Sequence, residues 1–330
     1  MIRLLIALAV LCILPVFMML FLKVLDRHFS FAGGYVCGTI FNLTVFSLCV
    51  RKMSRDMAEP GMVPVKVVLV TIVIEALAFA AVVCVRCFRE KRWLGIGNLL
   101  YCHKKPDERY RENRLYLPVC IGAFLIWLAG AFSYFCYIPQ GAVAMMADIN
   151  RLDFFGITNS DPMVMLGYYL KKLCGISQAD AACIVIPLSF YAAFVVLMWE
   201  MADTVFGPQV LKRSLCFLAE GVLVVAGDCL YSQPFIVLHG MNSLGNVLLV
   251  LCVPLVFIIG LRLIFSEEKL IKPENKRLLM PVYWLALLLC IVSAYLLEKR
   301  AFALIGLNMV IFILLFAGRR YLPWLQSSKS

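Results

Sequence analysis

Residues 117–138 read LPVCIGAFLIWLAGAFSYFCYI and contain no charged side chain. A helix of this length, rising about 1.5 Å per residue, crosses the roughly 30 Å hydrocarbon core of a bilayer. Because a backbone surrounded by hydrocarbon must satisfy its own hydrogen bonds, such a run is expected to be helical. It therefore predicts a membrane-spanning helix.

Similar apolar runs recur along the whole chain, and the charged residues lie almost entirely in the gaps between them. We expect about nine spans, at about 2–22, 31–50, 67–85, 117–138, 182–205, 215–231, 246–265, 280–297 and 301–318. The composition agrees, since 63% of the 330 residues are hydrophobic and only 15% are charged, outside the range of a soluble domain. The predicted fold is all-α: a polytopic transmembrane helical bundle that forms a single integral membrane domain over residues 1–330.

The basic side chains indicate how the bundle is oriented. Nine lysines and arginines lie between Arg86 and Arg114, and the positive-inside rule therefore predicts that the loop at about 86–116 is cytoplasmic. Counting spans from this loop puts the N-terminus outside, the C-terminus in the cytoplasm and the loop at about 139–181 outside. The pattern suits a multi-pass protein of a bacterial cytoplasmic membrane.

The formal net charge of +11 raises the question of a nucleic-acid partner. The basic residues lie between spans and form no soluble basic face, so we expect none. Anionic lipid headgroups are the expected counter-charge. The predicted partners are thus the lipid bilayer and other membrane proteins.

The fourteen cysteines predict neither a disulfide framework nor a metal site. Most lie inside predicted spans, where cysteine acts as a small apolar residue. Cys84-x-x-Cys87 with Cys102-His103 has zinc-like spacing, but it combines the end of a span with a loop full of basic residues. We identify no metal ligands and no cofactor from the residues themselves.

The predicted external loop contains the signals of a short helix of its own. Asp161 is suited to cap the free N–H groups of a helix start, and Pro162 to the first helical position. Gly175 is suited to end the helix. The apolar residues between them recur at three- and four-residue spacing: Met163, Leu166, Leu170 and Leu173. This spacing predicts a short amphipathic helix in the outer membrane interface, with Tyr168 and Tyr169 at headgroup depth.

The next four residues, Ser177-Gln-Ala-Asp180, have the form of a capping box that opens the following span. The predicted loop is therefore a shaped external element rather than a tether.

Two segments resemble a known family. Residues 169–176, Tyr-Leu-Lys-Lys-Leu-Cys-Gly-Ile, lead into a span that bears Pro187, and residues 232–240, Ser-Gln-Pro-Phe-Ile-Val-Leu-His-Gly, precede a span that contains Pro254. Together these regions, within about 117–256, resemble an uncharacterised family of bacterial multispanning proteins related to the C-type (GT-C) glycosyltransferase superfamily. The family pattern has paired aspartates directly after the fourth span, where this chain has residues 139–142, Pro-Gln-Gly-Ala.

The resemblance implies transfer of a sugar from a polyprenyl-phosphate donor on the external face. Such enzymes use an acidic residue of the first large external loop as general base or ligand of a divalent metal, because an acceptor hydroxyl must lose its proton while a lipid phosphate departs. The candidate catalytic residues are Asp148, Asp153 and Asp228. Asp161 is better explained as a helix cap.

Basic and polar side chains near these acids are the candidate substrate-binding residues. They are Tyr168, Lys171, Lys172, His239 and Asn242. The two lysines could meet the phosphate of the donor. Asp228 and His239 flank the next external connection and could bind phosphate, metal or a hydroxyl; the alternative is an interfacial aspartate that reaches water and a loop histidine.

Glu75 lies near the middle of the third predicted span, in an otherwise apolar run. An acid inside a membrane marks a functional site by default. The alternative is a protonated side chain that hydrogen-bonds a neighbouring helix. At the cytoplasmic boundary of the fifth and sixth spans the charges are expected to form ion pairs with one another; they are Glu200, Asp203, Lys212, Arg213 and Glu220.

Three functions stay open at this point. The first is a membrane glycosyltransferase. The second is a catalytically degenerate relative that serves as a scaffold or accessory component of cell-envelope glycan assembly, which the missing paired aspartates favour. The third is a small-molecule transporter, for which the chain offers no inverted repeat.

Overall fold

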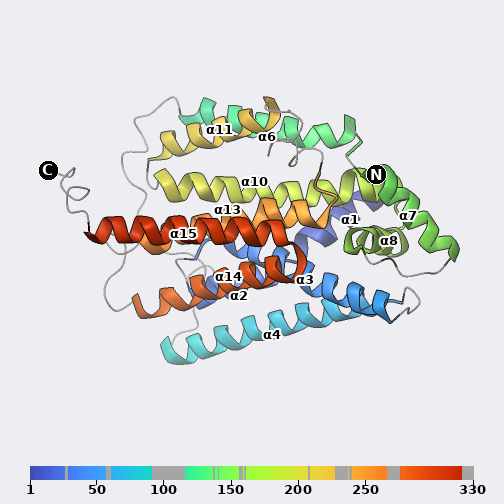
Figure 1. The fold of residues 1–330 in the computed structure, drawn as a ribbon, viewed down its shortest axis with the longest axis horizontal. Coiled ribbons are helices and arrows are strands. Elements are labelled where there is room, and N and C mark those ends of the chain that lie inside the picture. The colour runs from blue at the N-terminus through green and yellow to red at the C-terminus, as the bar shows by residue number, and fades with distance from the viewer. Residues whose placement is uncertain are drawn as a thin grey trace.

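The computed structural model describes residues 1–26, 29–56, 61–90, 116–136, 138–139, 141–155, 159, 161–206, 209–226, 237, 240–265 and 276–321. Over these ranges the chain is all-helical and has no strand (Figure 1). The predicted all-α class is confirmed. In chain order the elements are α1 (Ile2–Ile13), α2 (Val16–Leu25), α3 (Phe31–Arg55), α4 (Val63–Glu90), α6 (Tyr116–Cys136), α7 (Ala142–Phe155), α8 (Pro162–Cys174), α9 (Gln178–Asp180), the π-helical turn η2 (Ala181–Val185), α10 (Ile186–Phe206), α11 (Val210–Ala226), α13 (Leu244–Phe265), α14 (Lys276–Leu297) and α15 (Lys299–Tyr321).

Within the described ranges, six segments are long and apolar enough to cross a membrane. They are Ile2–Leu25, Phe31–Arg55, Val63–Val85, Leu117–Cys136, Gln178–Phe206 and Leu244–Leu263. The other three predicted spans fall on α11, α14 and α15, which are helices outside this set. The chain thus has the apolar helices of a membrane protein.

The long helices lie side by side along one axis, and α7 and α8 gather at the end where the chain begins (Figure 1). Of the candidate spans, α3 and α10 are the most deeply buried. α4 packs mainly against α2 and α3 in the described part of the chain and exposes a row of large apolar side chains, among them Leu69, Val73 and Leu77. Apolar side chains in such numbers on the outside of a helical bundle face lipid.

The first predicted span, 2–22, is not one continuous helix. It is interrupted at Leu14–Pro15, and its second part, α2, continues to Leu25. Proline causes the break because it has no N–H and its ring clashes with the preceding turn. Asn42 of α3 reaches the break and donates from its Nδ2 to the Leu14 carbonyl oxygen over 3.3 Å.

Two glycines of α3 allow α2 to pack closely at this break. A Cβ atom at Gly38 would lie 2.5 Å from the Pro15 carbonyl oxygen, and one at Gly34 would lie 3.1 Å from the Met19 Cα. The spacing Gly34-x-x-x-Gly38 is the small-residue pattern that lets membrane helices approach each other. The helices can approach this closely because both positions carry a hydrogen atom in place of a side chain.

The start and stop signals of α8 are confirmed. The Asp161 side chain accepts a hydrogen bond of 2.9 Å from the Met163 N–H, and Gly175 ends the helix with a left-handed φ of 64°. The Ser177 hydroxyl caps α9, accepting from the Asp180 N–H over 3.0 Å. The predicted loop at about 139–181 is a structured element that carries a short helix.

The apolar side of α8 packs mainly against other helices, and Tyr169, expected at headgroup depth, is buried. Residues on several sides of α8 are buried, including Met163, Met165 and Leu170, whereas Leu173 is exposed. α8 packs against α1, α3 and α7 at one end of the bundle, so protein rather than lipid covers most of its apolar side. Its apolar side chains are covered by other helices because α7 closes over them.

α7 is a second helix within this loop. Its buried residues recur at spacings of three, four and three: Ala142, Met145, Ile149 and Leu152. α7 meets α8 at Gly167, where a Cβ atom would lie 2.7 Å from the Ile149 Cδ1. Together α7 and α8 form the cap at one end of the bundle, called the α7–α8 end below.

Candidate functional site

At the α7–α8 end, one carboxylate meets two ammonium groups. Asp153 in the last turn of α7 forms ion pairs with Lys171 and Lys172 in the last turn of α8. The Lys172 Nζ lies 3.0 Å from the Asp153 Oδ1 and 5.5 Å from the ring centre of Tyr168. We call Asp153, Tyr168, Lys171 and Lys172 the Asp153 cluster.

The helix ends explain why the charges sit there. The carbonyl groups at the C-terminus of a helix carry partial negative charge, which favours the lysines of α8 and disfavours Asp153 on α7. The two lysines compensate for this position. Burial works to raise the pKa of Asp153, but the hydrogen bonds from Lys171 and Lys172 lower it overall. The pKa of Lys172 is raised in turn by its hydrogen bond to Asp153.

This environment makes Asp153 a poor general base. A base needs a free lone pair and a pKa near the working pH, whereas both oxygens of Asp153 accept from ammonium groups and its pKa is lowered. The two lysines are better placed than Asp153 to contact a ligand. Lys172 exposes 52% of its side chain and can turn towards a ligand.

The other two acids of this loop are also engaged. Asp148 pairs with Arg151, one turn further along α7, over 3.2 Å at an exposed position. Asp161 accepts from the first N–H groups of α8, and its pKa is raised mainly by burial. The structure therefore brings Asp153 to the predicted lysines but leaves Asp148 in a pair of its own.

Asn242 lies elsewhere. Its side chain is buried, and its Nδ2 is 3.7 Å from the place that a Cβ atom of Gly141 would take, beside the start of α7. At about 1.5 Å per residue the two ends of α7 are roughly 16 Å apart, so Asn242 does not belong to the Asp153 cluster. Asp228 and His239 lie outside the described residues.

Glu75 is buried in α4 and faces α2, with 6% of its surface exposed. Within the described part of the chain, neither of its carboxyl oxygens has a hydrogen-bond partner. The predicted intramembrane acid is thus directed into the bundle and away from lipid.

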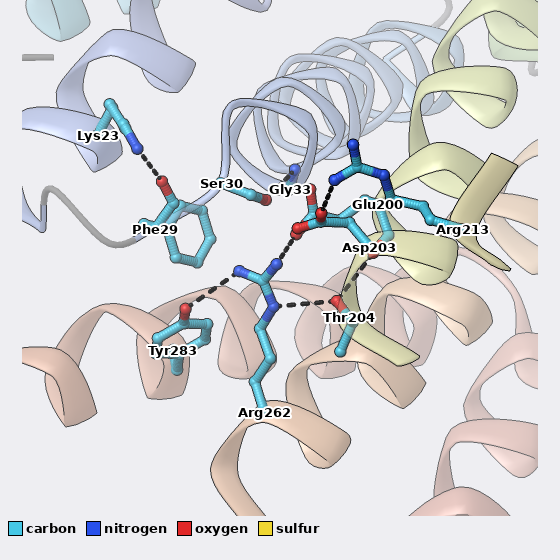
Figure 2. Close-up of polar contacts among 10 residues, drawn as sticks. All are labelled: Lys23, Phe29, Ser30, Gly33, Glu200, Asp203, Thr204, Arg213, Arg262 and Tyr283. Carbon is cyan, nitrogen blue, oxygen red and sulfur yellow. Dashed lines mark hydrogen bonds and ion pairs between the residues drawn. The ribbon is translucent and has the colours of Figure 1, made fainter. Parts of the chain in front are cut away.

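A network of charged side chains lies near the C-terminal ends of α10 and α13, at the opposite end of the bundle (Figure 1). Figure 2 shows its contacts. Arg262 of α13 pairs with the buried Glu200 of α10 and also donates to the Thr204 hydroxyl over 3.1 Å and to the Tyr283 hydroxyl over 3.3 Å. These contacts join α10, α13 and α14. Because the donors of Arg262 and the Glu200 carboxylate satisfy each other, the network is a structural tie rather than a site with spare bonding capacity.

The predicted ion pairing at this end is confirmed for one pair, Asp203 with Arg213, which bridges the turn between α10 and α11. The expectation for Glu200 is wrong in its partner, which is Arg262 from a more distant part of the chain. Glu220 accepts instead from the Cys216 thiol, at 3.5 Å, within α11.

Of the zinc-like pattern, Cys84 and Cys87 belong to α4, and Cys102 and His103 lie outside the described residues. Among the residues that are described, no three His, Cys, Asp or Glu side chains gather as metal ligands would.

No protein-family model matches the chain. A search of curated proteins finds no significant relative, and a search of solved structures finds no significant match.

Proposed function

We propose that this chain is a multispanning membrane protein that binds the phosphate of a polyprenyl-phosphate-linked sugar at its α7–α8 end, as a non-catalytic component of cell-envelope glycan assembly. The observation that carries the proposal is the pair of lysines that share the single carboxylate of Asp153. Two ammonium groups and one carboxylate leave one positive charge at the cluster. A phosphate monoester or diester can neutralise this charge and accept charge-assisted hydrogen bonds from the lysines.

The lipid-linked sugar is inferred from the resemblance to the GT-C glycosyltransferase superfamily, whose donors combine a phosphate with an isoprenoid chain. The cluster suits such a ligand because it lies at the end of apolar helices. Exposed apolar residues of α7, Phe154 and Phe155, immediately follow Asp153. An isoprenoid chain and a phosphate could thus be bound beside each other.

The state of the acids favours binding over sugar transfer. Asp153 is held by two lysines, Asp148 pairs with Arg151, and Asp161 caps α8. Each of the three already accepts from a basic side chain or a backbone N–H, and a divalent metal would have to displace these partners. The degenerate-relative hypothesis therefore has more support than the enzyme hypothesis.

We also propose nine spans, with the N-terminus and the α7–α8 end outside a bacterial cytoplasmic membrane and the C-terminus inside. Contacts that join the N-terminus, the α3–α4 connection and the α14–α15 connection to this end support an alternating path. Arg3 donates to the Gly175 carbonyl over 3.3 Å, Tyr169 to the Gly61 carbonyl over 2.7 Å, and Arg51 to the Leu296 carbonyl over 2.9 Å.

Sidedness can be tested with cysteines introduced at two exposed lysines, Lys52 near the α7–α8 end and Lys212 near the opposite end. In intact cells, a membrane-impermeant maleimide should label Lys52→Cys, and Lys212→Cys only after lysis. The reverse pattern would contradict the proposed orientation.

Binding can be tested with the purified protein in nanodiscs and a short-chain polyprenyl phosphate, by native mass spectrometry. The double substitution Lys171→Met and Lys172→Met should weaken binding about tenfold or more, as expected for lost hydrogen bonds to a charged group. Lys52→Met is the matched control, because it removes an exposed positive charge near the same end without touching the cluster.

Equal affinities of the double variant and the wild-type protein would overturn the proposal. Sugar transfer that is lost in both Asp148→Asn and Asp153→Asn would instead restore the enzyme hypothesis.

A further inference from the structure

Glu75 has the environment of a carboxyl group that is not ionised. It lies mid-way along α4 with 6% of its surface exposed, and its neighbours on the outer side of the helix, such as Ile74 and Leu77, are apolar and exposed. Within the described residues neither of its oxygens has a hydrogen-bond partner at normal geometry, although the Met18 N–H is directed towards the carboxyl group, and no ion pair with a basic side chain is present. An ionised carboxylate in such a place is strongly disfavoured, as charges at the centre of a bilayer are.

The backbone next to Glu75 offers a hydrogen-bond donor. The carboxyl group faces the Met18 N–H, which lies in the first turn of α2, just after the break between α1 and α2. The first N–H groups of a helix have no partner within the helix, so this N–H can interact with an ionised carboxylate.

The titratable groups on α2 and α3, the helices packed against α4, do not place a positive charge beside the Glu75 carboxyl group. On α2, Lys23 donates to the Phe29 carbonyl over 2.7 Å, near the opposite end of the bundle. On α3, Arg51 donates to the Leu296 and Leu297 carbonyls at the α7–α8 end. The others on α3 are Tyr35, Cys37, Cys49, Lys52 and Arg55.

We propose that Glu75, beside the start of α2 at the α1–α2 break, forms an intramembrane site that binds and releases a single proton. With the proton bound, the carboxyl group is neutral, as its buried position favours. When the proton passes to water, the carboxylate is left facing the Met18 N–H. The proposal is independent of phosphate binding, because Glu75 belongs to α4 and the Asp153 cluster to α7 and α8.

Infrared spectroscopy of the full-length protein in nanodiscs tests the proposal directly. At neutral pH the wild-type protein should show the C=O band of a neutral carboxylic acid, and this band should disappear reversibly as the pH rises. Glu75→Gln, which keeps the shape of the side chain without a titratable group, should lack the band. Glu220→Gln separates any contribution from a second glutamate, whose buried Oε2 also has no partner among the described residues.

A second measurement uses dicyclohexylcarbodiimide, an apolar reagent that modifies protonated carboxyl groups inside membranes. Peptide mass spectrometry should find the adduct on Glu75, with a yield that falls as the pH rises. Glu200 is the matched buried control and should stay unmodified, because Arg262 holds it as an ion pair.

A band that is equally strong in Glu75→Gln would overturn the proposal. So would a neutral band that does not change between mildly acidic and alkaline pH, since such a group would bind a proton without releasing it. Protection from the reagent by sodium at constant pH would assign the site to a sodium ion and would also overturn the proton assignment.

Discussion

The surroundings of Asp153 decide between two roles that an aspartate can have, a general base or an ion-pair partner. An aspartate in a large loop of such a protein can be a base, but its two ammonium partners and its lowered pKa favour an ionised, fully engaged carboxylate. In the proposed function it competes with the ligand phosphate for Lys171 and Lys172.

We therefore predict that Asp153→Asn increases the affinity for polyprenyl phosphate roughly threefold to tenfold, as expected when one competing charge-assisted interaction is removed. The measurement is the same native mass-spectrometry titration. Asp148→Asn is the control and should change the affinity little, because its partner is Arg151. Weaker binding by Asp153→Asn would mean that the carboxylate itself contacts the ligand.

The lowered pKa of Asp153 also predicts a pH dependence of stability. A carboxyl group whose pKa is lower in the folded protein stabilises the fold above its ordinary pKa of about 3.9, and this contribution disappears as the pH falls through the lowered value. The difference in thermal stability between the wild-type protein and Asp153→Asn should thus stay constant from about pH 5 to pH 8 and shrink only in stronger acid. A difference that disappears near neutral pH would contradict the ion pairs.

Among the elements, the contact between α2 and α3 depends on the absence of a side chain at Gly38. We predict that Gly38→Ala destabilises the protein by about 1–3 kcal/mol, the usual cost of overpacking, because the added Cβ meets the backbone at Pro15. Thermal unfolding in detergent measures this. Gly306→Ala is the matched control in another helix, since nothing lies within 4 Å of its added Cβ. Equal melting temperatures for the two variants would contradict the close approach.

The elements also explain which features the sequence could predict. The cap at Asp161 and the stop at Gly175 depend on neighbouring residues, so local patterns suffice. α7 has its own signal in the spacing of Met145, Ile149 and Leu152, but its length is too short to be recognised as a span. The position of α8 depends on the helices that cover it, and local periodicity carries no information about them.

Over the whole molecule, polar contacts join distant segments, and the partners in these contacts cannot be predicted from a single sequence. Glu200 and Arg262 belong to different helices, and either side chain alone reads only as a charge near the end of an apolar run. The lysines of the Asp153 cluster were expected at the site, but their bonds to Asp153 follow from the packing of α7 on α8.

We predict that Arg262→Met destabilises the bundle by about 3 kcal/mol or more, because it leaves the Glu200 carboxylate buried without its partner. The double substitution Glu200→Met and Arg262→Met should recover most of the loss, since it removes both charges. The comparison requires unfolding curves of the three proteins in the same detergent. A double variant less stable than Arg262→Met would show that the pair is not the source of the effect.

The most direct test of the proposed function is photo-crosslinking in nanodiscs with a polyprenyl-phosphate probe that carries a diazirine near its phosphate. The account predicts adducts concentrated in residues 142–174, reduced by excess unlabelled polyprenyl phosphate and by the double substitution Lys171→Met and Lys172→Met. Adducts spread evenly over the lipid-facing helices, or gathered around Arg262 at the opposite end, would contradict it.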